Sequence, residues 1–287
     1  MKTVLYTALA LLAFAGNSIL CRLALGADAI DAASFTAIRL LSGIIVLATI
    51  MKMTQSKSTI TSGGSWKASF MLFLYAVTFS YAYVSLETGI GALILFGSVQ
   101  ITMILVGLLS GSRFHYFEWL GVLVAFAGFV YLVMPGVTAP SLIGFILMSI
   151  AGIAWGFYTL AGKGSVNPLC DTSSNFLRTL PLVIVLVAVT FQHSTMSQKG
   201  ILLAVLSGGI ASGIGYTIWY AALGGLSAIQ AAVVQLLVPV IAAVGGVVFA
   251  DEHFSFRLVL SSLMILGGIL AVVLGKYYSE QKASSKT

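Results

Sequence analysis

Apolar residues along the chain gather into long continuous stretches, which are separated by short polar connections. A helix needs about 20 mostly apolar residues to cross the hydrocarbon core of a bilayer. Stretches of about that length occur at residues 4–25, 33–51, 67–86, 89–109, 118–134, 141–162, 175–191, 200–223, 226–249 and 256–276. Strands of a membrane barrel would be shorter and would alternate in polarity. The pattern therefore predicts an all-α integral membrane protein with ten transmembrane helices.

Composition supports a lipid environment. Hydrophobic residues make up 59% of the chain and charged residues only 8%, and the mean hydropathy is +1.07. A soluble domain carries about 25% charged residues, because water must solvate its surface. The connections between the apolar stretches leave no room for a sizeable soluble domain. The lipid bilayer is therefore the first partner that the sequence predicts.

The net charge of +6 reflects membrane orientation. If the N-terminus lies inside, the cytoplasmic loops and tails receive Lys2, Lys52, Lys57, Lys67, Arg113, Lys163, Lys276, Lys282 and Lys286. The opposite side receives Arg22, Lys199 and Arg257, together with Asp28, Asp31, Glu87, Asp251 and Glu252. This bias follows the positive-inside rule and predicts that both termini are cytoplasmic, in a bacterial inner membrane. The sequence has no basic patch with interleaved aromatic residues, so it gives no indication of binding to nucleic acid.

The two halves of the chain repeat each other. The run 34–39 opens the second stretch and the run 174–178 opens the seventh, and each run ends with a lone arginine. A very short connection at 83–92 joins the third stretch to the fourth, and one at 220–228 joins the eighth to the ninth. Each half has five helices, so the halves enter the membrane from opposite sides, as in many secondary transporters. We expect a first repeat at 4–135, a second repeat at 141–276, and a cytoplasmic tail at 277–287.

Motifs in the second half resemble a known family. The run 215–223 reads GYTIWYAAL, and Ser227-Ala228, Pro239-Val240, the acidic turn 251–254 and Gly267-Gly268 follow in order. Trp155-Gly156 suits the first helix of the same unit. Together these motifs resemble the EamA module of the drug/metabolite transporter superfamily, present here as two copies that cover nearly the whole chain.

The resemblance implies ten helices, a central cavity between the halves, and transport of small metabolites, often the export of amino acids. The first copy departs from the pattern. It has Thr102 near the place of the family's proline, and Gly111-Ser112-Arg113 where the acidic turn is expected. The two halves are therefore not expected to be functionally identical.

Polar residues near the middle of the stretches are candidates for lining a solute path. They are Asn17, Ser98, Gln100, Thr102, Ser149, Ser212 and Gln235. An amide in hydrocarbon is costly unless it is partnered, so it usually faces the bundle interior or a wet cavity. Gln100 and Gln235 occupy nearly equivalent places in the fourth and ninth stretches. The alternative is a hydrogen bond between helices, worth about 0.6 kcal/mol on average.

Aromatic residues suggest a second part of the path. Tyr75, Phe79 and Tyr83 recur every four residues and therefore share one face of the third helix. Tyrosine combines an apolar ring with a polar tip, which suits an amphipathic solute. Core packing or interfacial anchoring are the alternatives. The predicted substrate-binding residues are Asn17, Phe79, Tyr83, Gln100, Trp155, Tyr158, Tyr216, Trp219 and Gln235.

Arg39 and Arg178 are the basic residues expected inside the stretches. An intramembrane arginine is functional by default, although one near a helix end can extend its head group to the interface. Both arginines could bind a substrate carboxylate or satisfy carbonyls and headgroups. Glycine pairs such as Gly152/Gly156 and Gly209/Gly213 share one helix face and predict close helix contacts.

Enzyme motifs are missing from the sequence. The three histidines are far apart along the chain, and no serine-nucleophile elbow or zinc-protease motif occurs. We therefore expect no catalytic residue, no metal and no cofactor. The sequence predicts a transporter that moves a small metabolite by alternating access, with export of amino acids as the leading case. A membrane-embedded lipid-modifying enzyme, or a structural or receptor bundle without transport, is the alternative. Facilitated diffusion or exchange is the expected energetics, because no carboxylate is expected at mid-membrane.

Overall fold

The computed structural model describes residues 2–54, 63–109, 116–134, 139–162, 165, 167–223, 225–226 and 233–284. The described chain is helical, apart from its connections and one isolated antiparallel bridge between Ile30 and Met196. Its helices are α1 (Lys2–Leu25), α2 (Ala32–Met53), α3 (Trp66–Tyr83), α4 (Thr88–Leu109), α5 (Tyr116–Val133), α6 (Leu142–Gly162), α7 (Pro168–Arg178), α8 (Leu180–Thr190), the short η1 (Phe191–His193), α9 (Gln198–Val205), the π-helical η2 (Leu206–Ile214), α10 (Gly215–Leu223), α12 (Leu237–Phe249) and α13 (Phe256–Ser284).

Seven helical segments of the described chain are long and apolar enough to cross a membrane. They are Lys2–Leu25, Ala32–Met53, Thr88–Leu109, Leu142–Gly162, Leu169–His193, Gln198–Trp219 and Phe256–Gly275. Two further apolar helices, Glu118–Val133 and Val233–Phe249, are shorter. The helix α3 is rich in aromatic residues, with one tryptophan, three phenylalanines and three tyrosines among its 18 residues. The prediction of an all-helical protein with several membrane-spanning helices is thus confirmed.

Polar residues just before several helices fix where these helices begin. The side chains of Asp31, Ser65, Asn167 and Ser197 each accept a hydrogen bond from a backbone N–H in the first turn that follows. Such caps satisfy N–H groups that have no partner within the helix. Inside a bilayer no water could do so, and therefore short capped connections keep the backbone paired up to the membrane surface.

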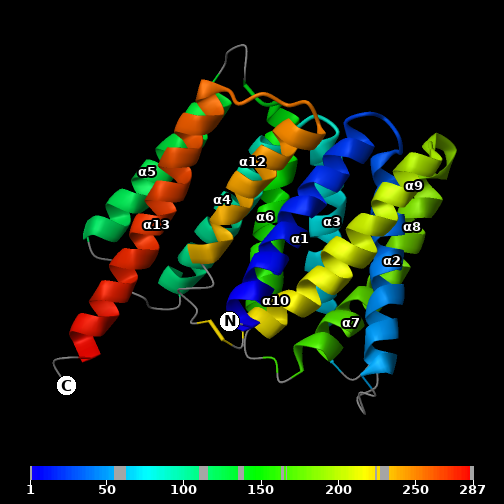
Figure 1. Ribbon diagram of the computed structural model, residues 1–287, viewed down its shortest axis with the longest axis horizontal. Helices are drawn as coiled ribbons and strands as arrows, with labels where there is room; N and C mark the ends of the chain where they lie inside the picture. Colours follow the sequence, from blue (N-terminus) through cyan, green and yellow to red (C-terminus); the bar gives the residue numbers. More distant parts are fainter. Residues whose placement is uncertain are drawn as a thin grey trace.

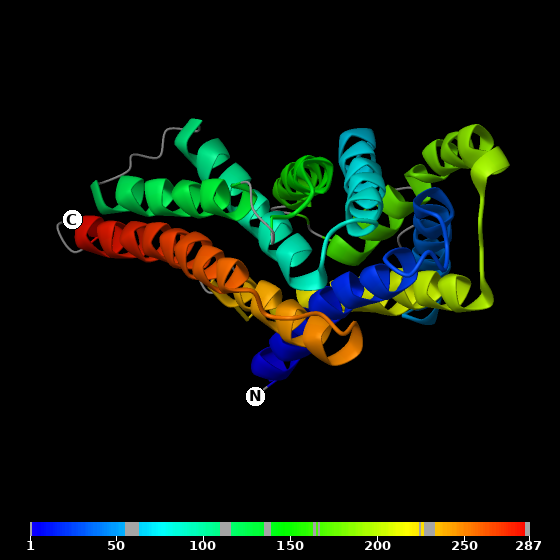
Figure 2. The same ribbon diagram turned by 90° about the horizontal axis from the view of Figure 1, so that it is seen from above.

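The helices stand side by side across the molecule (Figure 1). α5 and α13 form a pair along one flank, and α2, α8 and α9 lie along the opposite flank (Figures 1 and 2). Between the flanks, α1 packs against α10, η2 and α12, while α6 packs against α3 and α4. Helices that are distant in the sequence therefore meet at the centre of the molecule.

Small residues allow these central helices to approach closely, as the glycine spacing predicted. A Cβ on Gly152 would lie 2.5 Å from the Cβ of Ser98, and one on Gly156 would lie 3.1 Å from the Cβ of Thr102. α6 is therefore held directly against α4. In lipid there is no hydrophobic driving force for helices to associate, so close packing contacts of this kind contribute much of the stability of their association.

The structure corrects two expected boundaries. The seventh span was expected to begin at residue 175, but helix α7 begins at Pro168. Its polar residues 171–175 read as a connection by hydropathy, yet Thr172, Ser173, Ser174 and Asn175 are buried against neighbouring helices. The tenth span was expected to end at 276, but α13 continues to Ser284. Some predicted features lie outside the described residues. They are the segments 55–62, 111–113, 227–232 and 285–287, which include most of the start of the ninth span, the Ser227-Ala228 motif, Lys57 and Arg113, and also Lys163.

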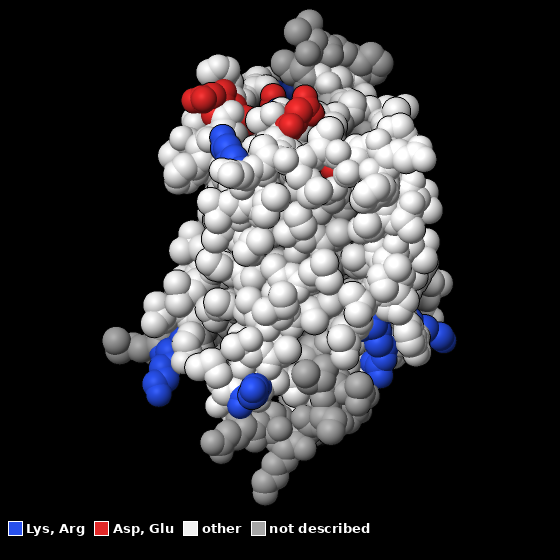
Figure 3. Space-filling model, turned by 90° about the vertical axis from the view of Figure 1, so that its right-hand side faces the viewer, with Lys and Arg blue, Asp and Glu red and all other residues white. Residues whose placement is uncertain are grey.

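Charge is divided between the two ends of the molecule. On the face in Figure 3, acidic side chains gather at one end and most basic side chains at the other. We call the first the acidic end; it carries the connections 26–31, 84–87 and 250–255. We call the opposite end, where α1 begins at Lys2, the basic end. The start of α1 and the end of α13 both lie towards the basic end (Figure 1).

Candidate functional site

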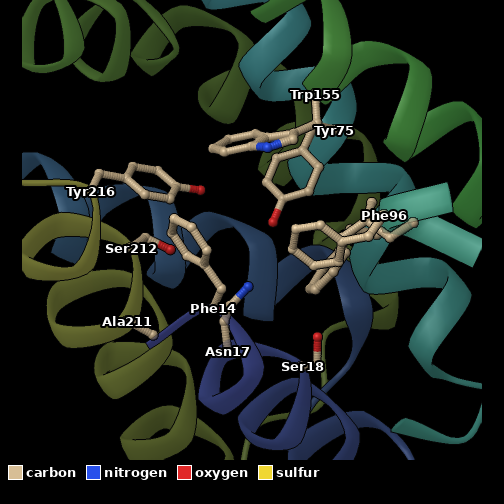
Figure 4. Close-up of a pocket in the computed structure, with 11 residues that line it drawn as sticks. Phe14, Asn17, Ser18, Tyr75, Phe96, Trp155, Ala211, Ser212 and Tyr216 are labelled. Carbon is tan, nitrogen blue, oxygen red and sulfur yellow. The ribbon is translucent and has the colours of Figure 1, made fainter. Parts of the chain in front are cut away.

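A small cavity, lined mostly by buried residues, lies where the central helices meet (Figure 4). It offers about 20 Å³ to the centre of a water molecule, which is room for one or two waters. Its lining comes from α1, α3, α4, α6, η2 and α10. The lining residues are Phe14, Asn17, Ser18, Tyr75, Phe79, Leu95, Phe96, Trp155, Ala211, Ser212 and Tyr216.

Aromatic rings form a continuous wall around this cavity. The ring of Trp155 lies 4.7 Å from that of Tyr75 and 5.0 Å from that of Tyr216, between centroids. Phe14 meets Tyr216 edge to face at 5.9 Å. The hydroxyl groups of Tyr75 and Tyr216 both point into the space between the rings (Figure 4). The wall therefore offers broad apolar contact with a few polar tips, which is the usual chemistry of a small-molecule site.

Polar atoms from α1 and η2 line the other side. The Ser207 hydroxyl donates a 2.6 Å hydrogen bond to Oδ1 of Asn17, which orients the amide. The Ser212 hydroxyl is buried and, among the described residues, has no hydrogen-bond partner. A buried polar group without a partner is costly, and it is a natural contact for a polar group of a ligand.

The π-helical segment η2 places these polar groups at the cavity. Its wider turns occur at Leu206–Ile214, directly beside the lining residues Ala211 and Ser212. π-helical turns are rare and are often found at functional sites. Gly208 packs so tightly against the backbone carbonyl of Arg39 on α2 that a Cβ at this position could not fit. The close contact between η2 and α2 therefore depends on glycine.

The two intramembrane arginines have different surroundings. Arg178 donates a 2.6 Å hydrogen bond to the carbonyl of Gly63 at the basic end, so it satisfies a backbone group. Arg39 is only 2% exposed, which excludes an interfacial position for its head group. Its Nη2 donates a 2.9 Å hydrogen bond to the hydroxyl of Tyr75, and its guanidinium lies against the rings of Tyr75 and Phe79.

The structure brings together some of the predicted site residues. Asn17, Phe79, Trp155 and Tyr216 line the cavity. Tyr83, Tyr158 and Trp219 lie behind the wall, where their rings contact Phe79, Trp155 and Phe14 respectively. Gln100 on α4 is buried and Gln235 is half-buried, and neither lines the cavity.

Several lining residues were not predicted. Tyr75 was recognised in the aromatic stripe of α3 but not chosen, and Ser212 was recognised only as a mid-span polar residue. The recurrence of aromatic residues every four positions was the signal that could have identified Tyr75. Phe14, Leu95, Phe96 and Ala211 look like any other apolar residues of their helices, so the sequence offered no signal for them.

Glu252 connects two helices at the acidic end. Its carboxylate accepts hydrogen bonds from the backbone N–H of Thr88 at 2.8 and 2.9 Å and from the Thr88 hydroxyl at 3.0 Å. It also forms an ion pair with Nε of Arg22 at 3.2 Å. The acidic turn thus joins the end of α1 and the beginning of α4. We call these three residues the Glu252 clasp.

Glu87 lies beside the clasp. Partial burial raises the pKa of its carboxyl, and the nearby negative charge of Glu252 raises this pKa further. Arg22 and His253 oppose these effects without cancelling them. Among the described residues, no group of three His, Cys, Asp or Glu side chains is placed to hold a metal ion.

Comparisons with known proteins agree with this arrangement. The EamA-like transporter family matches residues 142–274, from the start of α6 into α13. An uncharacterized protein of Pseudomonas aeruginosa is 48% identical over 272 residues, which are 95% of this chain and 94% of that protein. The chain belongs to the EamA-like transporter family. It is therefore a multi-pass membrane protein of the drug/metabolite transporter superfamily.

More distant relatives of this EamA-family chain carry transport names. A probable amino-acid metabolite efflux pump of Escherichia coli is 24% identical over 229 residues, which are 71% of this chain and 77% of that protein. An uncharacterized transporter of Archaeoglobus fulgidus is 27% identical over 213 residues, covering 71% of this chain and 74% of that protein. A crystal structure with 18% identity shares the fold, with a TM-score of 0.63 over 94% of this chain and 98% of its own.

Proposed function

We propose that this protein exports a small amphipathic metabolite, with amino acids as the leading class, through the cavity at the meeting point of its central helices. The observation that carries the proposal is the cavity itself, which is small, lined by aromatic rings and supplied with a few buried polar groups. The name of the Escherichia coli relative supports amino acids and the outward direction.

Alternating access is the mechanism we propose. The cavity has room for one or two waters only, so a solute can enter only after the helices move apart. Two inverted five-helix repeats, at 4–135 and 141–276, would give two nearly equivalent states that open to opposite sides. The Glu252 clasp is placed to hold the acidic end closed in one of these states. The tight contacts of Gly152, Gly156 and Gly208 are surfaces along which helices could shift.

The separation of charge supports the proposed orientation. We propose ten spans with the basic end and both termini in the cytoplasm, because positively charged loops are retained there. Labelling of single cysteines in intact bacteria tests this orientation. A cysteine placed at Ser58 should resist a membrane-impermeant reagent, and a cysteine placed at Asp28 should react. Strong external labelling at Ser58 would reverse the orientation.

Transport down a solute gradient is the proposed energetics. Among the described residues, acidic side chains lie only at or near the ends of helices, and none lines the cavity. A proton-coupled carrier usually has an ionisable group within its spans. Exchange and facilitated diffusion need no such ionisable group, so they agree with the lining of the described cavity.

Reconstitution into vesicles tests the function. We expect counterflow of amino acids, but not of sugars, nucleosides or organic cations, and we expect the solute to cross unmodified. Trp155→Ala removes the ring between Tyr75 and Tyr216 and should raise the half-saturation concentration about 30-fold, which corresponds to about 2 kcal/mol. Tyr81→Ala on α3 is the matched control, because Tyr81 is exposed away from the cavity. Counterflow of none of these solutes would refute the proposal.

A further inference from the structure

Arg39 carries a permanent charge in the interior of the molecule. A guanidinium stays protonated at every physiological pH, and the Arg39 side chain is buried, with 2% of the residue exposed. A buried charge is costly unless hydrogen bonds and an opposite charge compensate it. The surroundings of this side chain should therefore contain its compensation.

The described residues compensate this charge only in part. Arg39 has one side-chain hydrogen bond, to the Tyr75 hydroxyl, and its guanidinium carbon lies 5.1 Å and 4.9 Å from the ring centres of Tyr75 and Phe79. Its Nη1 has no hydrogen-bond partner among the described atoms. The one ion pair in the described part of the chain joins Arg22 to Glu252 at the acidic end. No carboxylate of these residues neutralises Arg39.

The position of Arg39 connects its charge to the cavity. Tyr75 and Phe79, the two side chains against which the guanidinium lies, both line the cavity. Arg39 donates to the Tyr75 oxygen, so the proton of this hydroxyl is directed elsewhere, and the hydroxyl points into the cavity (Figure 4). A hydroxyl that accepts from a cation becomes a stronger donor, because hydrogen bonds in series polarise one another.

We propose that the cavity selects solutes that carry one carboxylate, which accepts a hydrogen bond from the Tyr75 hydroxyl and is balanced by the charge of Arg39. This inference rests on the proposed transport function and names the group that the site recognises. A single cation in a low-dielectric site favours one negative charge and disfavours two. The ammonium group of an amino acid would then lie against the ring of Trp155, which also lines the cavity.

Matched solutes test the inference in vesicles that contain the full chain. For leucine, phenylalanine and serine, counterflow is compared between the amino acid, its amide, which lacks the carboxylate, and the carboxylic acid without the amino group. Wild-type protein should transport at least one amino acid of the set and should prefer it to its amide by about 30-fold or more, the effect expected for losing a charge-assisted hydrogen bond in a buried site. The preference between acid and amide, and not the absolute rate, is the measured quantity.

Variants then assign the preference to residues. Arg39→Gln should reduce it to about threefold or less, and Arg39→Lys should restore part of it by returning the charge. Tyr75→Phe keeps the ring against Arg39 but removes the hydroxyl, and it should also reduce the preference. This variant covers the case in which Arg39→Gln fails to fold. Arg178→Gln is the control, because Arg178 binds a carbonyl at the basic end, and its preference should equal that of wild type.

The outcomes separate the two proposals. If wild-type vesicles transport amides as well as acids, or if Arg39→Gln and Tyr75→Phe both keep the wild-type preference, the carboxylate site is wrong while the transport function stands. If wild-type vesicles transport no solute of any set or of the wider panel, the transport function fails and this inference fails with it.

Discussion

Replacement of Glu252 should weaken the acidic end of the molecule more than any other single change of charge there. Its carboxylate, with a side chain only 8% exposed, accepts three hydrogen bonds from Thr88 and pairs with Arg22. A hydrogen bond to a charged acceptor contributes about 1.5–3 kcal/mol, and bonds that share one acceptor group are not additive. A negative charge at the beginning of α4 also interacts favourably with the helix dipole, by about 0.3–1 kcal/mol.

From these contributions we expect Glu252→Ala to lower the free energy of unfolding by about 3 kcal/mol. Part of the ion-pair energy is discounted, because Arg22 is partly exposed and regains water. Glu252→Gln keeps one acceptor oxygen for the Thr88 N–H, and it should cost about 1–2 kcal/mol. The loss in Glu252→Ala corresponds to a decrease in Tm of about 6–12 °C for a protein of this size class.

Thermal unfolding of the purified protein in detergent, followed by tryptophan fluorescence, measures these effects. Asp251→Asn is the matched control, because Asp251 is the adjacent acid of the same turn and is exposed. Its backbone has a φ of 52°, which asparagine tolerates, so the control should keep the wild-type Tm within about 2 °C. The reasoning fails if Asp251→Asn lowers Tm as much as Glu252→Ala, or if both Glu252 variants unfold at the wild-type temperature.

Two further predictions concern packing and pH. Gly208→Ala places a Cβ against the carbonyl of Arg39 and should cost about 1–3 kcal/mol in unfolding free energy, whereas Gly16→Ala, with open space around its Cβ, should cost nothing; equal Tm values for both variants would contradict the packing argument. The raised pKa of Glu87 means that this carboxyl contributes stability at low pH, and the contribution is lost as the pH rises through the raised value. Glu87→Gln should therefore raise Tm relative to wild type at pH 7 and match wild type at pH 4, and a Tm difference that stays constant with pH would contradict this assignment.

The sequence was most informative where hydropathy alone decides the structure. The helices α1, α2, α4 and α6 begin and end within about three residues of the expected spans. Helix α7 was misjudged because hydropathy treats residues 171–175 as polar and therefore as solvent-exposed. Their hydroxyl and amide groups are buried instead, and Ser173, for example, donates a hydrogen bond back to the carbonyl of Leu169.

The candidate site shows a similar division. The four-residue spacing of Tyr75, Phe79 and Tyr83 correctly indicates that these residues share a face of α3, because the period belongs to the helix itself. How far each of them lies from the cavity depends on neighbouring helices, and only Tyr75 and Phe79 line it. Gln100 and Gln235 are polar residues at comparable depths in their helices, yet neither lines the cavity.

The sequence by itself determined that this chain is helical and membrane-embedded, because each backbone group in lipid must be paired within its own segment, and this requirement acts locally. It also determined which end of the molecule is basic, since most charged residues lie in the connections outside the hydrocarbon. The tertiary structure alone decided which side chains meet. The rotation of each helix about its axis depends on contacts such as Gly208 with Arg39 and Gly152 with Ser98, which join segments far apart in the chain. Those contacts buried the guanidinium of Arg39 behind Tyr75, and no local pattern in the sequence specifies that arrangement.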